Sequence, residues 1–284
     1  MNIGVYYGEP EIQVQTARAL YQGALANGHK AELLPDAKYR TDFDAVAFYG
    51  MSVPHIKAWQ DYRAAGKPVI ICDLGYFGED RGAGGTGHLK VAVNHWHPTE
   101  YLQKFKHRND RFAPFNLPVT PMRKGGSHIL LAGIGPKSSV LYGIKHQSWD
   151  EAAVAEIRKH TKRPIVYRCK PNHAHTFHKI PGTEWSEPTT PLGKLIVDAW
   201  AIVTHHSNVG VDGLMKGVPC FANDGVPTVA GLKDLSQIES PRILKLSEQQ
   251  QFLADLAYTQ WTRKEIEAGK AWAHLESEGL IVRS

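Results

Sequence analysis

Short apolar runs alternate with amphipathic segments from the first residue of the chain. The segment at residues 11–27 has apolar side chains at helical spacing and ends at Gly28, and a second such segment, residues 55–65, ends at Gly66. Strands that alternate with helices in this way predict a parallel sheet with helical crossovers. The predicted strands between these helices cover residues 2–7, 31–35, 45–49 and 67–72.

The same alternation returns in the second half of the chain. Predicted strands cover residues 128–132, 164–169, 201–204 and 218–222, and predicted helices cover residues 149–160, 192–199 and 207–216. We therefore predict an α/β fold with two Rossmann-like parallel-sheet domains that face a cleft, because ligands of such sheets bind beyond the carboxyl ends of the strands. The expected boundaries are residues 1–122, residues 127–247, and a helical tail at residues 248–284 that packs across both domains.

The alternation breaks between Tyr76 and Gly126. Four glycines, at positions 82, 84, 85 and 87, predict a mobile loop. A basic stretch with interleaved aromatic residues follows, and then three prolines. Residues 123–126, Arg-Lys-Gly-Gly, are the predicted interdomain linker.

Composition excludes several classes of protein. With 284 residues, 42% hydrophobic and 21% charged, the chain is typical of a globular protein and unlike a disordered one. Three widely spaced cysteines make neither a disulfide framework nor a structural zinc site. We expect a soluble, cytoplasmic protein, because no signal peptide precedes the first strand and no apolar run reaches 18 residues. A net charge of +5 suggests an anionic partner.

Residues 200–222 are the most informative segment for function. A buried strand leads into Thr-His-His-Ser-Asn, and a helix follows at once. Exposed backbone N–H groups and the positive helix end near Ser207 would bind a phosphate, and Asp212, about one turn further on, could reach a ribose hydroxyl. The turn at residues 133–139, Gly-Ile-Gly-Pro-Lys-Ser-Ser, also follows a strand. It is not a Walker motif, because the Gly-Lys-Ser/Thr order is absent.

These segments carry a family resemblance. Residues 200–222 resemble the nucleotide-sugar site in the C-terminal half of GT-B glycosyltransferases, especially those of the capsule-polysaccharide and Kdo-transferase type, and residues 164–171 resemble the strand that precedes it. The Trp-His-Pro, Thr-His-His-Ser-Asn and Gln-Trp segments are similar to those of small phage-encoded proteins regarded as GT-B-like. Two positions depart from the pattern: Asp212 replaces the usual Glu, and Asn172 follows Pro171 where His-Pro is common.

The resemblance implies a glycosyltransferase that uses a nucleotide-sugar co-substrate, without a metal ion or a further cofactor, in the cytoplasm of a host if a phage encodes it. Bond cleavage builds negative charge on the leaving phosphate, which fixed cations and N–H dipoles stabilise. The predicted donor-binding residues are Gly133, Gly135, Lys137, Ser138, Arg168, Lys170, His205, His206, Ser207, Asn208 and Asp212.

An inverting transfer also needs a base for the acceptor hydroxyl. Asp73 is the first candidate, because it follows the strand at residues 67–72 at the carboxyl edge of the first sheet. His97 is the second, with Glu79 and Asp80 in reserve. A retaining enzyme could dispense with this base, so the stereochemistry stays open.

The basic aromatic stretch supplies the predicted acceptor side. Its cations could follow a phosphate backbone while an aromatic residue stacks on an extruded base, which would suit hydroxymethylpyrimidine in double-stranded DNA. A glycan acceptor, a nucleotide-sugar epimerase and a non-catalytic nucleotide- or nucleic-acid-binding protein remain alternatives. The predicted acceptor residues are Lys90, Trp96, Lys104, Arg108 and Arg111, with Tyr101, Lys106, Arg123 and Lys124 as further contacts.

Two patterns that could suggest a metal are assigned to other roles. Asp42-Phe43-Asp44 has the D-x-D form of metal-dependent glycosyltransferases but precedes a strand, at the edge away from the expected cleft. Three histidines at 173, 175 and 178 lack an acidic or thiolate fourth ligand nearby. We expect no metal site.

Overall fold

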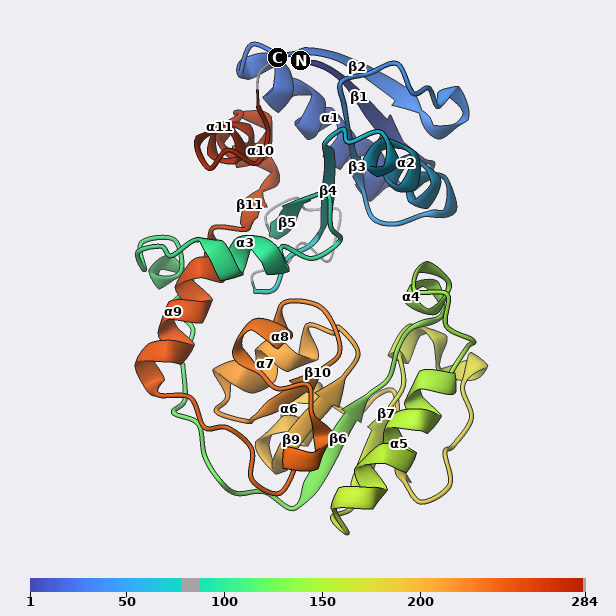
Figure 1. Cartoon of the computed structure of the whole chain (residues 1–284), viewed down its shortest axis with the longest axis vertical. Coiled ribbons are helices and arrows are strands. Elements are labelled where there is room, and N and C mark those ends of the chain that lie inside the picture. The colour runs from blue at the N-terminus through green and yellow to red at the C-terminus, as the bar shows by residue number, and fades with distance from the viewer. Residues whose placement is uncertain (78–86, 283–284) are drawn as a thin grey trace. The chain divides into compact units, whose positions relative to one another are not determined.

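The computed structural model describes residues 1–77 and 87–282, and the chain forms two compact units. Unit 1 consists of Met1–Pro98 together with Leu256–Ser284, and unit 2 consists of Thr99–Asp255. The chain therefore passes from one unit to the other twice. Figure 1 labels the helices and strands of both units, each of which combines a sheet with covering helices.

Unit 1 is built on a six-stranded sheet in the order β11-β5-β4-β3-β1-β2. The neighbours β2, β1, β3 and β4 are parallel, whereas β5 runs antiparallel to β4 and β11 antiparallel to β5. The strands are β1 (Asn2–Tyr7), β2 (Lys30–Pro35), β3 (Ala45–Tyr49), β4 (Val69–Leu74), β5 (His88–Val93) and β11 (Gln260–Thr262).

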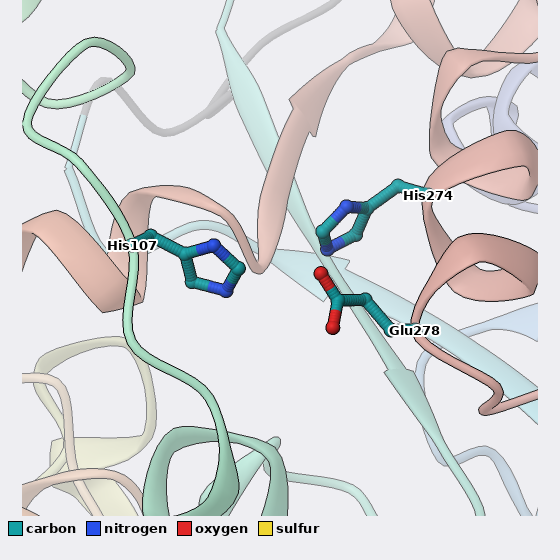
Figure 2. Close-up of side chains that lie close together, drawn as sticks. All are labelled: His107, His274 and Glu278. Atoms are coloured by element: carbon teal, nitrogen blue, oxygen red, sulfur yellow. The ribbon is translucent and has the colours of Figure 1, made fainter.

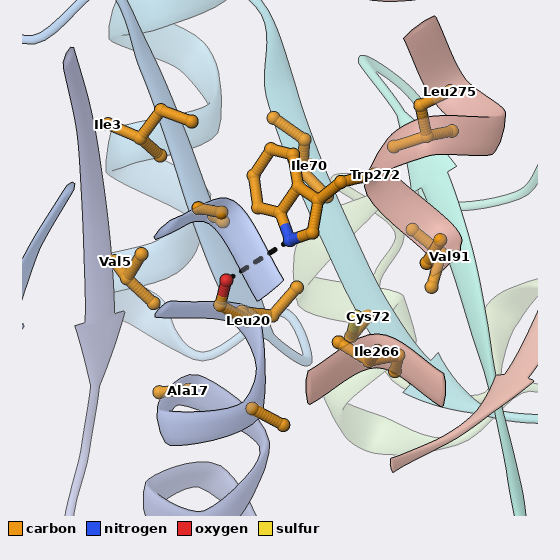
Figure 3. Close-up of a cluster of buried hydrophobic side chains, with 14 of the residues drawn as sticks. Ile3, Val5, Ala17, Leu20, Ile70, Cys72, Val91, Ile266, Trp272 and Leu275 are labelled. Carbon is orange, nitrogen blue, oxygen red and sulfur yellow. Dashed lines mark hydrogen bonds between the residues drawn. The ribbon is translucent and has the colours of Figure 1, made fainter. Parts of the chain in front are cut away.

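Helices cover both faces of this sheet. On one face, α1 (Glu11–Ala26) packs with α10 (Arg263–Glu267) and α11 (Lys270–Ser277) over the core drawn in Figure 3. There the indole N–H of Trp272 donates to the backbone oxygen of Leu20 over 3.1 Å, which ties the end of the chain to its first helix. On the other face lies α2 (Val53–Ala64), whose start is capped by the Ser52 side chain.

Unit 2 has a five-stranded, wholly parallel sheet in the order β10-β9-β6-β7-β8. On the face of this sheet that α5 covers, Ile129 and Leu131 of β6 belong to one hydrophobic core with Val154 and Ile157 of α5. The strands are β6 (His128–Ala132), β7 (Ile165–Arg168), β8 (Glu184–Trp185), β9 (Ala199–Thr204) and β10 (Cys220–Ala222). The helices are α3 (Thr99–Lys104), α4 (Pro136–Leu141), α5 (Ser148–His160), α6 (Leu192–Val197), α7 (Val209–Met215), α8 (Pro227–Ala230) and α9 (Leu246–Ala257).

The boundaries of the units differ from the predicted ones. Residues 99–122 belong to unit 2, and the predicted tail is divided, with most of α9 in unit 2 and the rest in unit 1. The predicted linker at residues 123–126 lies within unit 2. The backbone N–H of Arg123 donates to the Gly217 oxygen over 3.0 Å, and Arg163 donates to the Gly126 oxygen over 3.3 Å. These contacts explain why a Pro- and Gly-rich segment is part of a folded unit here.

Within residues 1–77 and 87–282, no helix is both long and apolar enough to cross a bilayer.

Candidate functional site

Four neighbouring strands of unit 2 end at one edge of the sheet. Because β7, β6, β9 and β10 are parallel, the segments that follow them emerge side by side. These segments are residues 133–139, 169–170, 205–208 and 223–224, and they contain all the predicted donor-binding residues except Arg168, at the end of β7, and Asp212, in α7.

The turn after β6 rests on a buried carboxyl group. Asp150 is completely buried, and its oxygens accept hydrogen bonds from the Ile134 N–H (3.0 Å) and the Tyr167 hydroxyl (2.7 Å). Burial raises the pKa of Asp150 to about 6. Gly133 passes so close that an added Cβ would lie 2.7 Å from an Asp150 oxygen, so only glycine fits this turn.

The helix after this turn contributes hydroxyl and amino groups. Pro136 occupies the first position of α4, which suits its missing N–H. Lys137 is exposed, whereas Ser139 is buried and its hydroxyl donates back to the Gly135 oxygen over 3.2 Å. The Ser138 hydroxyl lies 3.2 Å from Nε2 of His206, so the segments after β6 and β9 are in contact.

The two histidines after β9 form a linked pair. Their Nδ1 atoms lie 3.0 Å apart, so one ring donates and the other accepts. His205 is buried between the rings of Tyr142 and Trp149, with centroids 4.5 and 5.4 Å away. Burial lowers the pKa of His205, which favours its neutral form. The hydroxyl of Tyr142 donates to Asp224 over 2.5 Å, which adds the segment after β10 to the same network.

The two basic residues at the end of β7 have different environments. Lys170 is exposed, and its side chain packs beside Gly135. Arg168 instead donates to the Thr190 backbone oxygen (2.9 Å) and the Ser186 hydroxyl (3.4 Å), and burial lowers its pKa. The guanidinium of Arg168 thus binds the loop before α6, a contact that its position at a strand end did not predict.

Ser207 lies two residues before the helix that follows the histidines and bonds to its first residue. Its hydroxyl accepts from the Val209 N–H (3.3 Å), and its own N–H donates to the Thr204 hydroxyl (3.2 Å). The helix begins at Val209, slightly later than predicted, with Asn208 before it and Asp212 in its first turn.

Sequence reasoning missed four residues of this region: Tyr142, Trp149, Asp150 and Asp224. Asp224 had a usable signal, because it follows the predicted strand at residues 218–222 at the same sheet edge. Trp149 and Asp150 lie on α5 and Tyr142 directly follows α4, where nothing in the local pattern separates a site residue from a packing one.

Asp73 in unit 1 lies near the carboxyl end of β4, at the predicted sheet edge. Its Oδ2 accepts from the Trp96 indole N–H over 2.7 Å and its Oδ1 from the Leu74 N–H over 2.8 Å. Lys90 is opposite Asp73 in the β4–β5 register, and its ammonium lies 3.2 Å from Nδ1 of the buried His97.

This arrangement corrects the role predicted for Lys90. The side chain is only 3% exposed, and its ammonium lies over the Trp96 ring, 5.0 Å from the centroid. A buried lysine cannot follow a nucleic-acid backbone. The alternation of side chains in β5 is the reason, since Leu89 and Val91 face one core and Lys90 faces the opposite side of the sheet.

Trp96 lies in unit 1 with Lys90, and the other predicted acceptor residues lie in unit 2. Lys104 and Arg108 are exposed and Arg111 is half-buried. Lys106 is exposed and pairs with buried Asp255 over 3.0 Å. Tyr101 is buried with its hydroxyl 2.5 Å from His107, so its ring is not available for stacking as predicted. The reserve bases Glu79 and Asp80 and the glycines at 82, 84 and 85 lie outside the described residues.

The motifs with a metal-like pattern have other partners. Asp44 accepts from the Asn2 N–H over 2.6 Å, and Asp42 pairs with Arg40 over 3.3 Å. His178 pairs with Glu151 over 2.9 Å. Figure 2 shows His274 of α11 and Glu278 one helical turn further on, both in unit 1; the third labelled residue, His107, belongs to unit 2.

Comparisons with known proteins identify the type of fold. No family model and no curated sequence matches this chain. Among solved structures, the beta Kdo 2,4 transferase of Thermosulfurimonas dismutans KpsC is 16% identical, with 92% of each chain covered and a TM-score of 0.52. The beta Kdo 2,7 transferase of the same protein is 13% identical, with 96% of this chain and 99% of that chain covered and a TM-score of 0.50.

The chain has a GT-B-type fold. The predicted α/β class with two Rossmann-like, parallel-stranded units is thereby confirmed. A Methanocaldococcus jannaschii UDP-GlcNAc 2-epimerase, in complex with UDP-GlcNAc and UDP, is a more distant match: it is 10% identical, with a TM-score of 0.29 over 78% of this chain and 83% of that chain. Within the GT-B-type fold, the sheet edge of unit 2 groups lysine, serine and histidine side chains that suit an anionic ligand.

Proposed function

We propose that this chain is a glycosyltransferase that moves a sugar from a nucleotide-sugar donor to an acceptor hydroxyl. The observation that carries the proposal is the junction of three strand ends in unit 2, where His206 meets Ser138 and Lys170 packs beside Gly135. Such a group of cations, hydroxyls and imidazoles binds phosphate, and the chain shares its fold with two Kdo transferases.

The proposed donor chemistry relies on charge. As the bond between sugar and phosphate breaks, negative charge grows on the leaving group. Lys137 and Lys170 are exposed at this edge and can approach that charge, and Ser138 can donate a hydrogen bond to it. We propose that these groups act without a metal ion and that the nucleotide-sugar is a co-substrate, with no resident cofactor. Nucleotide-activated Kdo is the first donor to test, because the two similar structures are Kdo transferases.

Asp73 is the proposed base for the acceptor hydroxyl. A carboxylate can take the proton as the hydroxyl attacks, and Asp73 is half-buried with both oxygens oriented by hydrogen bonds. His97 is a weaker candidate, because it is buried against Lys90.

For the acceptor we propose a glycan rather than DNA. Lys90 and Tyr101 are buried, so two groups expected to contact DNA have other roles. What remains between residues 88 and 111 is a short run of exposed cations, Lys104, Lys106 and Arg108, and Lys106 is already paired with Asp255.

The donor is tested first by binding. A thermal-shift panel of nucleoside mono- and diphosphates and their sugars, Kdo included, should contain one nucleotide that raises the melting temperature, and the rise should grow with the logarithm of its concentration above Kd. Lys137→Ala and Lys170→Ala should each lower the affinity for that nucleotide about tenfold, as expected for the loss of a charge-assisted contact. Lys162→Ala, an exposed lysine just before β7 at the opposite edge, is the matched control.

Transfer is then tested with the stabilising nucleotide-sugar and glycan or hydroxymethylated DNA acceptors. Sugar on the glycan supports the proposal, and sugar on DNA restores the DNA acceptor. Conversion of the free nucleotide-sugar to its epimer, with no transfer, would instead identify an epimerase. Binding of a nucleotide with no turnover of any donor would identify a binding protein.

A further inference from the structure

The chain segment after β5 reverses direction at Asn94. This residue has a φ of 63°, in the left-handed region, and its backbone and side chain both bond to Val69: Asn94 N–H donates to the Val69 oxygen (2.8 Å) and Asn94 Oδ1 accepts from the Val69 N–H (2.9 Å). The indole N–H of Trp59 in α2 donates to the Asn94 oxygen over 2.8 Å. The reversal is therefore held by three hydrogen bonds, two with Val69 of β4 and one with Trp59 of α2.

After this reversal, Trp96 and His97 return over the sheet toward the carboxyl end of β4. His97 reaches Lys90, and Trp96 reaches Asp73, although Asn94 lies at the amino end of β4. The ring of Trp96 is fixed from two sides: it packs on His97, with centroids 4.9 Å apart, and the Lys90 ammonium lies over it. The indole N–H is thereby aimed at Oδ2 of Asp73.

We propose that Trp96 is a positioning residue for the Asp73 carboxylate, an inference that rests on the proposed transferase function and deepens it. The Leu74 N–H holds one oxygen and the Trp96 N–H holds the other. A carboxylate held at both oxygens keeps one orientation, so the lone pair that takes the acceptor proton keeps its direction. Trp96 therefore acts through Asp73, and stacking on an extruded base is not its role.

The test is a double-mutant cycle with Trp96→Phe and Asp73→Asn. Phenylalanine keeps an aromatic face for Lys90 and removes the N–H together with part of the ring. Loss of the N–H should lower kcat about ten- to a hundredfold, the equivalent of one charge-assisted hydrogen bond. The KM for the donor should stay within twofold. In the Asp73→Asn background, Trp96→Phe should change kcat by less than twofold, because the group that it positions is already gone.

Trp200→Phe is the matched control. It removes an indole N–H that donates to the Ile238 oxygen over 2.7 Å in unit 2, so it measures the cost of losing such a bond away from Asp73. Its kcat should equal that of the unmodified chain. An unchanged kcat in Trp96→Phe, or the same fall in both Asp73 backgrounds, overturns the proposal.

A second measurement needs no turnover and no Trp96 variant. In an NMR spectrum of the full chain, the indole N–H resonance of Trp96 should shift when Asp73 is replaced by Asn, and that of Trp200 should stay in place. A Trp96 resonance that does not move overturns the contact itself. Absence of transfer by the unmodified chain, with the Trp96 shift present, overturns the proposed function and leaves the contact standing as a structural one.

Discussion

Asp150 shows how the environment of one residue sets its chemistry. Two donors, the Ile134 N–H and the Tyr167 hydroxyl, stabilise its ionised form, yet complete burial outweighs them and raises its pKa to about 6 from 3.8. The residue holds the turn after β6 in place, and the turn carries the Lys137 and Ser138 of the proposed donor site. A structural carboxyl thus lies directly beneath the groups proposed to bind phosphate.

The raised pKa of Asp150 predicts a pH-dependent stability. Between pH 4 and pH 6 the folded chain holds a proton on Asp150 that the unfolded chain has lost. The stabilisation that this proton gives the folded chain is therefore complete below pH 4 and is lost as the pH rises through 6. Two pKa units correspond to about 3 kcal/mol of unfolding free energy. Asp150→Asn can keep the bond from the Ile134 N–H, and its amide N–H can donate to the Tyr167 hydroxyl oxygen in place of the second bond. The substitution should remove this slope in denaturant titrations at several pH values.

Glu184→Gln, an exposed position on β8, is the control for that series and should leave the slope unchanged. A slope that persists in Asp150→Asn would mean that another group carries it.

At the scale of elements, α7 depends on glycine for its position. A Cβ on Gly210 would lie 2.7 Å from the Pro227 side chain and 2.8 Å from the Cys220 sulfur. The helix can therefore approach β10 and α8 only without a side chain there, and this approach sets where Ser207 and Asp212 lie at the strand ends.

Gly210→Ala should accordingly cost about 1–3 kcal/mol of unfolding free energy, the usual effect of overpacking. Gly193→Ala in α6 is a matched control with nothing within 4 Å of the added Cβ, and it should stabilise by up to about 1 kcal/mol. Equal effects of the two substitutions on denaturant midpoints would show that α7 has room to move.

At the scale of the whole molecule, the two ends of the chain fold together in unit 1. Trp272, Ile266 and Leu275, from the last 30 residues, lie in the core drawn in Figure 3 with Leu20 of α1. Unit 2 has a separate core around β6 and α5. Loss of the C-terminal segment should thus affect the two units unequally.

A chain that ends at Asp255 should lose amide-exchange protection in β1, β3 and β4 and keep it in β6 and β9. The milder variant Trp272→Phe loses one buried hydrogen bond, worth about 1 kcal/mol, and should speed exchange in unit 1 alone. Protection that is lost throughout both units in Trp272→Phe would show that they unfold as one.

The sequence by itself determined the strands and helices wherever the spacing of apolar residues agrees with the residues that end an element, such as glycine. The runs at residues 2–7, 45–49 and 128–132 are strands in the structure. Order along the chain also placed the donor candidates at one sheet edge, because parallel strands align their ends. The local pattern of apolar and polar residues suffices for these features, since it indicates which side chains are buried away from water.

Only the tertiary structure decided the rest. The antiparallel direction of β5, the burial of Lys90, the partner of Arg168 and the assignment of residues 256–284 to unit 1 depend on contacts between positions far apart in the chain. A lysine between two apolar residues has the same local pattern whether its side of the strand faces water or a histidine. Neighbours in space make that choice, and they are set by the fold as a whole.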